Sequence, residues 1–198
     1  MRSRAVMVGA ALSLALAASA DAQPPTATLP FEVTGSAPQV CAIANPAVLT
    51  AGQLVNFQTL NGTTLQISQL ADPRTLATNA ASATVTFQAV CNFPHQIVLE
   101  SQNNGLYRGG AAGAPPPPGF ADGVPYTAQL SWGAVNSTFF VPATTRQRSQ
   151  DRVLVPQPTA GDLRILLTIQ AGASNLTANA PLVAGVYTDT LFITLEPQ

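Results

Sequence analysis

Apolar and polar residues alternate along most of this chain, and a period of two is the pattern of half-buried β-strands. The clearest run extends from Ala83 to Cys91, where every second side chain is apolar and the residues between them include Thr84, Thr86 and Gln88. The same pattern predicts further strands at residues 65–67, 97–99, 126–132, 163–169 and 191–195.

Turn-forming residues separate these runs. Pairs such as Asn104-Gly105 and Asp122-Gly123 stand between apolar segments, and Pro115 to Pro118 mark an exposed loop within residues 109–119. No long stretch of the mature chain has the 3.6-residue period of a helix, and Pro73 limits the region near it to about one helical turn. We therefore predict an all-β fold, a sandwich of two antiparallel sheets. Residues 142–151 are predicted to form a polar loop.

The first 22 residues have the features of a cleaved export signal. Arg2 and Arg4 precede an uncharged apolar run from Ala5 to Ala17, and small residues then offer a cleavage site after Ala22. The apolar run is too short to remain as a membrane anchor, and no later segment is long and apolar enough to span a bilayer. We expect residues 1–22 to be removed and the mature chain to be exported.

Residues 23–39 contain a second alternating pattern in a segment rich in proline and threonine. Pro30 cannot donate to a ladder of strand hydrogen bonds, so a strand here would pair fully on at most one side at that point. The segment is either a strand without a sheet of its own or a frayed tail with chance alternation. The apolar positions on its one face are Ala27, Leu29, Phe31 and Val33.

Charge is scarce in this chain. Charged residues make up 9% of the sequence, all eight basic residues are arginine, and the formal net charge is −1. Such a surface has no basic patch for nucleic acid. Two interpretations remain open: another chain covers much of the surface, or the surface is neutral and rich in Thr, Ser, Gln and Asn.

The two cysteines, Cys41 and Cys91, predict one disulfide in an exported chain. It would close a loop of about 50 residues and contribute about 4 kcal/mol in the chain-entropy model. Cys91 falls on the inward face of its strand, which favours a bridge between the two layers. A catalytic thiol or a metal site has little support, because His95 is the single histidine and no Cys-x-x-Cys motif is present.

Catalytic motifs are missing from the sequence. There is no Gly-x-Ser-x-Gly elbow, no His-Glu-x-x-His and no phosphate-binding glycine loop. We expect His95, beside Pro94 at the start of a strand, to cap or pack. We therefore expect no enzyme, no cofactor and no metal, with a glycosidase-like carboxylate pair as a distant alternative. The scattered carboxylates are Asp72, Glu100, Asp122, Asp151, Asp162 and Asp189.

Several motifs occur in an order that resembles a known family. After the alternating segment and Cys41 come Val90-Cys91-Asn92, then Gly123-Val124-Pro125-Tyr126, then Trp132-Gly133, and finally a terminal Ala184 to Thr190 that contains Gly-x-Tyr-x-Asp-Thr. This order resembles the spore coat protein U domain family, which includes subunits of archaic chaperone–usher pili. The resemblance covers nearly all of the mature chain.

The resemblance implies an incomplete immunoglobulin-like β-sandwich formed by residues 40–198 and completed by a donor strand from a neighbouring subunit or a chaperone. Residues 23–39 would be that donor strand, inserting Leu29, Phe31 and Val33, with Ala27 at its start, into the next subunit. The implied acceptor groove is lined by the last strand, which runs close to the end of the chain. Its lining residues would be Leu191, Ile193 and Leu195.

The leading hypothesis is thus a structural subunit of a pilus or coat at the cell surface, exported through the periplasm. Its implied partners are head-to-tail neighbouring subunits, a periplasmic chaperone and an outer-membrane usher. The alternative is a self-contained secreted β-sandwich, a binding or adhesion module whose N-terminal segment completes its own sheet and whose loops, such as 109–119, contact a ligand.

Overall fold

The computed structural model describes residues 28–45, 54–61, 64–109 and 115–198. The chain divides into two units, Met1–Ser36 and Ala37–Gln198, and each is described by itself. The predicted signal segment and the start of the predicted donor segment, including Ala27, lie outside the described residues.

The described part of the second unit is built from β-strands, and the described residues contain no helix. The strands are β1 (Cys41–Ile43), β2 (Leu54–Val55), β3 (Phe57–Asn61), β4 (Thr64–Ile67), β5 (Ala81–Cys91), β6 (His95–Ser101), β7 (Leu106–Arg108), β8 (Gly123–Val124), β9 (Tyr126–Trp132), β10 (Val135–Val141), β11 (Ser149–Val155), β12 (Thr159–Ile169), β13 (Tyr187–Thr188) and β14 (Leu191–Pro197).

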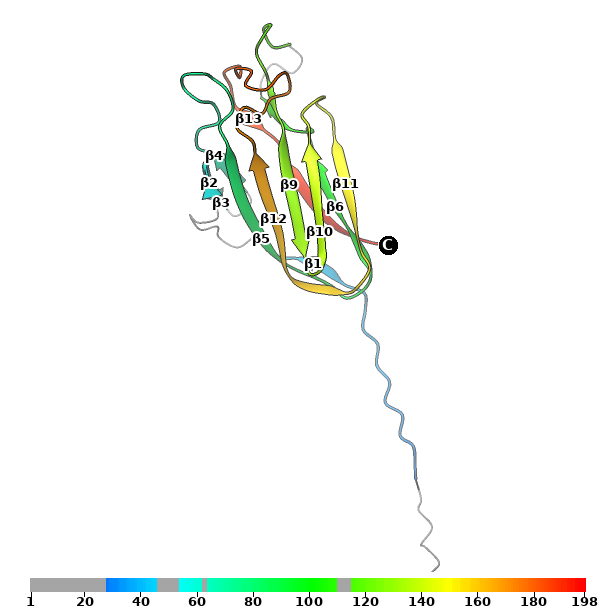
Figure 1. The fold of residues 1–198 in the computed structure, drawn as a ribbon. Helices are drawn as coiled ribbons and strands as arrows, with labels where there is room; N and C mark the ends of the chain where they lie inside the picture. Colours follow the sequence, from blue (N-terminus) through cyan, green and yellow to red (C-terminus); the bar gives the residue numbers. More distant parts are fainter. Residues whose placement is uncertain (1–27, 46–53, 62–63, 110–114) are drawn as a thin grey trace, which may run out of the picture. The chain divides into compact units, whose positions relative to one another are not determined.

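Two antiparallel sheets form the body of this unit (Figure 1). The larger has the order β1-β5-β12-β9-β10, with β2 also paired to β5. The second has the order β11-β6-β14, so β6 lies between the other two strands. Smaller ladders join β13, β7 and β8, and β3 to β4.

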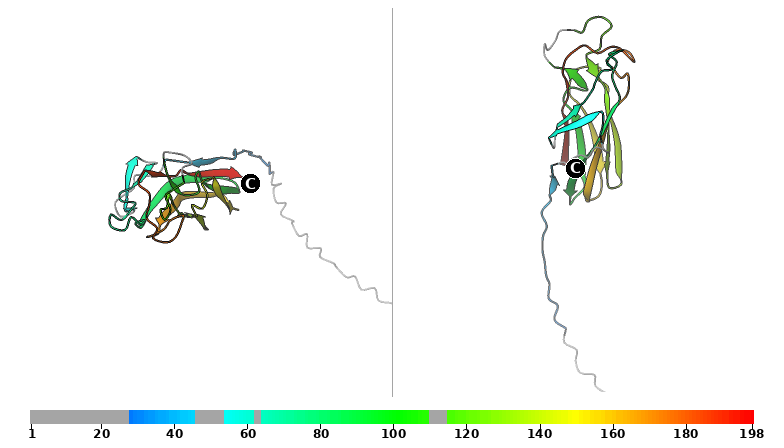
Figure 2. Two further views of the ribbon diagram at one scale, coloured as in Figure 1. Left: turned by 90° about the horizontal axis from the view of Figure 1, so that it is seen from above. Right: turned by 90° about the vertical axis from the view of Figure 1, so that its left-hand side faces the viewer.

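The core lies between the two sheets, whose layers are seen from two further directions in Figure 2. Leu163 and Ile165 of β12 and Ile97 and Leu99 of β6 belong to one buried cluster. Trp132, at the end of β9, is also buried and packs against the ring of His95. The alternation along β12 and β6 turns one face of each strand inward, which is why apolar residues two positions apart meet in the core.

The all-β prediction is confirmed, and the predicted strands correspond to β4, β5, β6, β9, β12 and β14. The region around Pro73 forms a single turn, in which the Leu76 N–H donates to the Asp72 carbonyl oxygen over 2.8 Å. Phe192, the apolar residue that breaks the alternation in the last strand, lies on the outer, exposed side of β14.

The prediction of a polar loop over residues 142–151 is wrong at its end, because Ser149 already belongs to β11. This strand lies at a sheet edge, and its first four residues, Ser149–Arg152, are polar. Its inward-facing Asp151 accepts a hydrogen bond from the Ser137 hydroxyl of β10 over 3.1 Å. The polar first half of β11 has no alternation of apolar residues that would mark it as a strand in the sequence. Its strand conformation depends on pairing with the neighbouring β6.

Cys41 and Cys91 form a disulfide, and they stand directly opposite each other in the β1–β5 ladder. The expectation of a bridge between the layers is therefore wrong: the bond joins two adjacent strands of one sheet. Hydrogen bonds at Val40 and Ala44 place the two cysteines at a non-hydrogen-bonded position of the ladder, where opposite side chains are closest.

The different burial of Leu163 and Leu154 predicts that their substitution by alanine changes the free energy of unfolding by different amounts. Leu163→Ala removes a side chain with no exposed area and should lower the free energy of unfolding by about 2–5 kcal/mol. Leu154→Ala, in the exposed outer face of β11, should change it by less than about 0.5 kcal/mol. Urea unfolding of the mature chain checks both, and equal effects would contradict this assignment of the core.

Candidate strand-acceptor site

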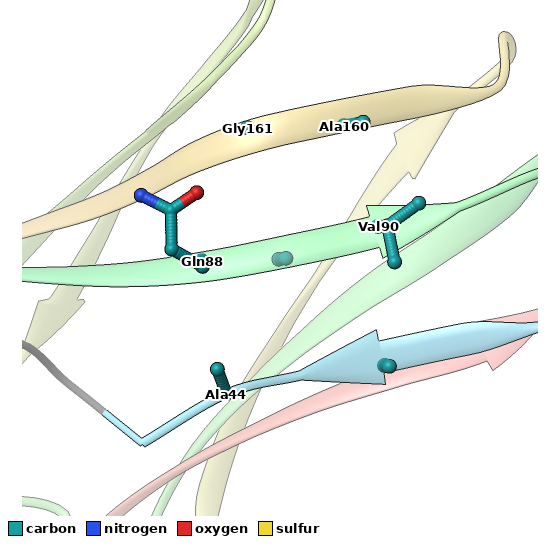
Figure 3. Close-up of a pocket in the computed structure, with 7 residues that line it drawn as sticks. Ala44, Gln88, Val90, Ala160 and Gly161 are labelled. Atoms are coloured by element: carbon teal, nitrogen blue, oxygen red, sulfur yellow. The ribbon is translucent and has the colours of Figure 1, made fainter.

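Two strand edges face each other without pairing. β14 is hydrogen-bonded to β6 alone, from Leu191 opposite Ser101 to Pro197 opposite His95. β1 is hydrogen-bonded to β5 alone. The two strands lie side by side, one from each large sheet, and among the described residues no ladder connects them. Figure 3 shows β14, in pale red, running along β1, in pale blue.

The core is incompletely covered along this seam. The inward side chains of both strands pack against the buried cluster, yet all of them are only partly buried. At the opposite seam, between β10 and β11, Phe139, Val141 and Val155 are buried, whereas Val135 and Val153 are partly buried. The β1–β14 seam differs in that none of its inward apolar side chains is fully buried. The five partly covered residues are Cys41, Ile43, Leu191, Ile193 and Leu195.

The free backbone groups belong to the same residues. The Thr190 carbonyl oxygen accepts from the Gln102 N–H over 2.9 Å, so in the alternating antiparallel pattern the odd-numbered residues of β14 direct their N–H and C=O away from β6. On β1, the Ala44 N–H donates to the Gln88 carbonyl oxygen over 2.8 Å. The backbone groups of Ile43 therefore point away from β5.

The predicted acceptor residues Leu191, Ile193 and Leu195 are thus on one face of one strand, directed at the core. The other side of the seam, formed by Cys41 and Ile43 of β1, was not part of the prediction. The alternation at positions 41 and 43 was its only sequence signal, and three residues are too few for a pattern to be recognised.

Asp189 holds the start of β14 in place. One carboxylate oxygen accepts from the Ser101 hydroxyl over 2.6 Å and from the Tyr126 hydroxyl over 2.7 Å. The other accepts from the backbone N–H groups of Asn103 and Thr190, over 2.9 and 2.8 Å. These hydrogen bonds attach the strand to β6, β9 and the turn after β6, and the bond from the Thr190 N–H is local. The contact explains the aspartate of the terminal motif.

Tyr187 is the second anchor in the terminal motif. Its hydroxyl donates to the backbone carbonyl oxygens of Val183, over 2.8 Å, and Ala121, over 3.2 Å. Burial, followed by the negative charge of Asp122, raises the pKa of Tyr187 to about 12. The phenol therefore stays protonated and ties the segment before β14 to the neighbouring loop.

Asn92 and the disulfide hold β1. The Asn92 side chain accepts from the Val40 N–H and donates to the Pro38 carbonyl oxygen, both over 2.8 Å. Together with the Cys41–Cys91 bond, this fixes a strand of only three residues. The Val90-Cys91-Asn92 motif thus supplies two of the attachments of β1.

The described part of the predicted donor segment forms no strand. Residues 28–40 have no regular secondary structure, and the side chains of Leu29, Phe31 and Val33 are 90%, 87% and 83% exposed. Three large apolar side chains with this exposure and a spacing of two form a surface suited to another protein.

Two surface hollows lie on the outer faces of the sheets. One is lined mainly by small residues of β1, β5 and β12, such as Ala160 and Gly161, with Gln88 as its polar side chain (Figure 3). The other surrounds Phe192 and contains two ion pairs, Arg152 with Glu196 at 3.0 Å and Arg148 with Glu100 at 3.2 Å. Both are surface features away from the seam's inward side chains.

Comparison of the chain with protein-family models, with curated proteins and with solved structures gives no match. Within the described ranges, no helix has the length and apolar character needed to cross a membrane.

The three tyrosines predict how stability depends on alkaline pH. Burial is the main cause that raises the pKa of Tyr107, Tyr126 and Tyr187, and nearby carboxylates add to it. Because the folded chain holds these protons more tightly than the unfolded chain, stability is complete below about pH 9 and falls above about pH 10. The chain has no lysine that would titrate in the same range.

Urea unfolding between pH 8 and 11.5 should therefore show a decline of up to about 1.4 kcal/mol per pH unit for each tyrosine. Tyr126→Phe should reduce the slope, because it removes the phenol whose pKa the fold raises most. A free energy of unfolding that stays constant up to pH 11.5 would contradict the burial of these groups.

Proposed function

We propose that this protein is a structural subunit of a secreted surface fibre or coat, assembled by donor-strand complementation between copies. In this proposal the second unit is an incomplete immunoglobulin-like sandwich, and the seam between β1 and β14 accepts a strand from a neighbouring subunit. The observation that carries the proposal is the set of partly covered core side chains, whose own backbone groups face the unpaired edge.

The predicted donor segment has the matching period. In an extended strand, residues two apart are about 6.6–6.8 Å apart, and the same spacing separates Leu191, Ile193 and Leu195 along β14. Side chains of Leu29, Phe31 and Val33 would thus meet the accessible core at regular intervals. Burying three such side chains is worth about 5–9 kcal/mol before the cost of ordering the segment.

Backbone pairing would supply the rest of the affinity. An inserted strand can bond to the free N–H and C=O groups of β14, which is the principle of recognition by β-strand addition. Pro30 of the donor segment has no N–H, which removes one such bond. Pro197 has none either, so β14 offers no N–H donor at that position. Pairing is therefore expected to centre on Leu191 to Leu195.

This mode of contact has consequences for assembly. A segment on one side of a subunit that inserts into a seam of the next is a head-to-tail contact that does not close, so it builds a filament. An uncovered apolar edge is also an aggregation hazard before assembly. A periplasmic chaperone that fills the seam and an outer-membrane usher are accordingly proposed as partners.

The alternative of a self-contained binding module requires the N-terminal segment to complete its own sheet. In the structure, residues 28–36 belong to no strand, and their side chains are exposed. The two hypotheses differ in which chain supplies the strand that fills the seam, and the truncation experiment separates them.

The first experiment removes residues 23–39 from the mature chain, which is produced in an oxidising compartment, and adds them back as a synthetic peptide. We expect the truncated chain alone to be unstable or aggregated, because its seam stays open. The peptide should convert it to a one-to-one complex with a strongly raised melting temperature. A truncated chain that is a stable monomer and ignores the peptide would refute donor-strand assembly.

Side-chain specificity within the peptide is a separate test. Phe31→Asp places a charge where the proposal buries an apolar ring, and it should weaken binding at least about a hundredfold. Thr28→Asp, on the opposite face of the strand, is the matched control and should change binding by less than about fivefold. Isothermal titration against the truncated chain measures both, and similar losses for the two peptides would count against the proposed face.

A further inference from the structure

Three side chains of metal-binding type, two cysteines and one histidine, meet at the junction of the two large sheets. Cys41 comes from β1, Cys91 from β5 and His95 from β6, and their two Sγ atoms and one imidazole nitrogen all lie within 4.8 Å of one another. The sequence did not suggest this cluster, because Cys41 is 50 residues from Cys91 and a single Cys-x-x-x-His pair, Cys91 and His95, is a weak signal.

The hydrogen bonds of His95 define which nitrogen is available. Its Nδ1 lies 2.8 Å from the Phe93 carbonyl oxygen, which can only accept, so Nδ1 carries the proton and donates. In the neutral ring the lone pair is then on Nε2. Histidine ligands of metals are commonly held in this way, with one nitrogen bonded to a backbone carbonyl and the other directed to the ion.

That lone pair accepts no hydrogen bond in the disulfide form. The His95 side chain has no exposed area, and Nε2 has no hydrogen-bond partner among the described residues. The ring packs against Trp132, with 5.1 Å between ring centroids, and the indole Nε1–H of Trp132 does not bond to it. A buried nitrogen without a partner is uncommon in native proteins and calls for an explanation.

We propose that the dithiol form of this chain, the form in which its cysteines are synthesised, binds one Zn²⁺-class ion through Cys41, Cys91 and His95. Binding displaces one proton from each thiol, so two protons leave as one divalent ion enters, and no electron is transferred. Two thiolates and one neutral imidazole are a ligand set that zinc prefers. A water molecule would complete the tetrahedron on the side of Cys41, which is only partly buried.

The ladder position of the cysteines suits this geometry. Two thiolates on a tetrahedral zinc lie roughly 3.8 Å apart, given zinc–sulfur bonds of about 2.3 Å. Cys41 and Cys91 are directly opposite each other at a non-hydrogen-bonded position, with 4.2 Å between their Cα atoms. Cysteines at such a position can hold an ion between them or bond to each other with little movement of either strand.

The ion would hold the same strand that the disulfide holds. It would attach β1 to β5 and also to β6 of the second sheet, and so keep one wall of the seam formed before oxidation. Bound thiolates are also withheld from disulfide formation until the ion leaves. This inference does not depend on the proposed assembly, since it concerns the folded unit alone.

The test uses the mature chain, reduced by a phosphine under anaerobic conditions and freed of reductant, with Co²⁺ as the spectroscopic probe. We expect one Co²⁺ per chain, thiolate-to-cobalt charge-transfer absorption, displacement by Zn²⁺ and release of two protons per ion. The oxidised chain is the matched control and should show none of these signals. A reduced chain without the charge-transfer band, or one that stays unfolded when Zn²⁺ is added, would overturn the proposal.

His95→Gln separates a three-ligand site from binding by two sulfurs alone. It should weaken Zn²⁺ binding about tenfold or more, while Glu100→Gln, a carboxylate outside the cluster, should leave it unchanged. X-ray absorption of the wild-type zinc complex reports the ligands without any variant, and two sulfurs with one imidazole are expected. Equal affinity of His95→Gln and wild type, or a zinc spectrum without imidazole, would refute the role of His95.

Discussion

A strand edge in water must pair, be covered or be protected, and in this protein that constraint falls on the seam between β1 and β14. The two strands belong to different sheets and face each other without a ladder among the described residues. Because the pleat couples side-chain and backbone directions, the residues with free N–H and C=O groups are also those that face the core. The unpaired edges of β1 and β14 therefore leave both backbone hydrogen-bonding groups and apolar side chains available for contact.

The structure holds this seam open rather than letting it collapse. Asp189 attaches the start of β14 through hydrogen bonds, and Asn92 and the disulfide attach the short β1. These contacts lie at the ends and backs of the two strands, away from the facing edges. In the proposed assembly, a seam held in this way would lose less conformational freedom on binding, so more of the contact energy would remain as affinity.

The low charge of the chain is consistent with such a site. Ion pairs are few among the described residues, and two of them, Arg148–Glu100 and Arg152–Glu196, lie on the outer face of the β11-β6-β14 sheet. The inward faces of β1 and β14 are apolar instead. A charge at these positions would have to be desolvated whenever another strand covered the seam.

The sequence by itself determined the all-β class and most of the long strands, because alternation of apolar residues is a local property that a sheet with one buried face imposes. It also indicated the cysteine pair, the apolar inward face of β14 and the alternating face at Leu29, Phe31 and Val33. Only the tertiary structure decided which strands are neighbours. It showed that the disulfide lies within a sheet, that polar β11 is an edge strand, that β1 forms the second wall, and that His95 meets both cysteines. Each of these depends on contacts between residues far apart in the chain, and a local pattern carries no information about which distant strand will lie beside it.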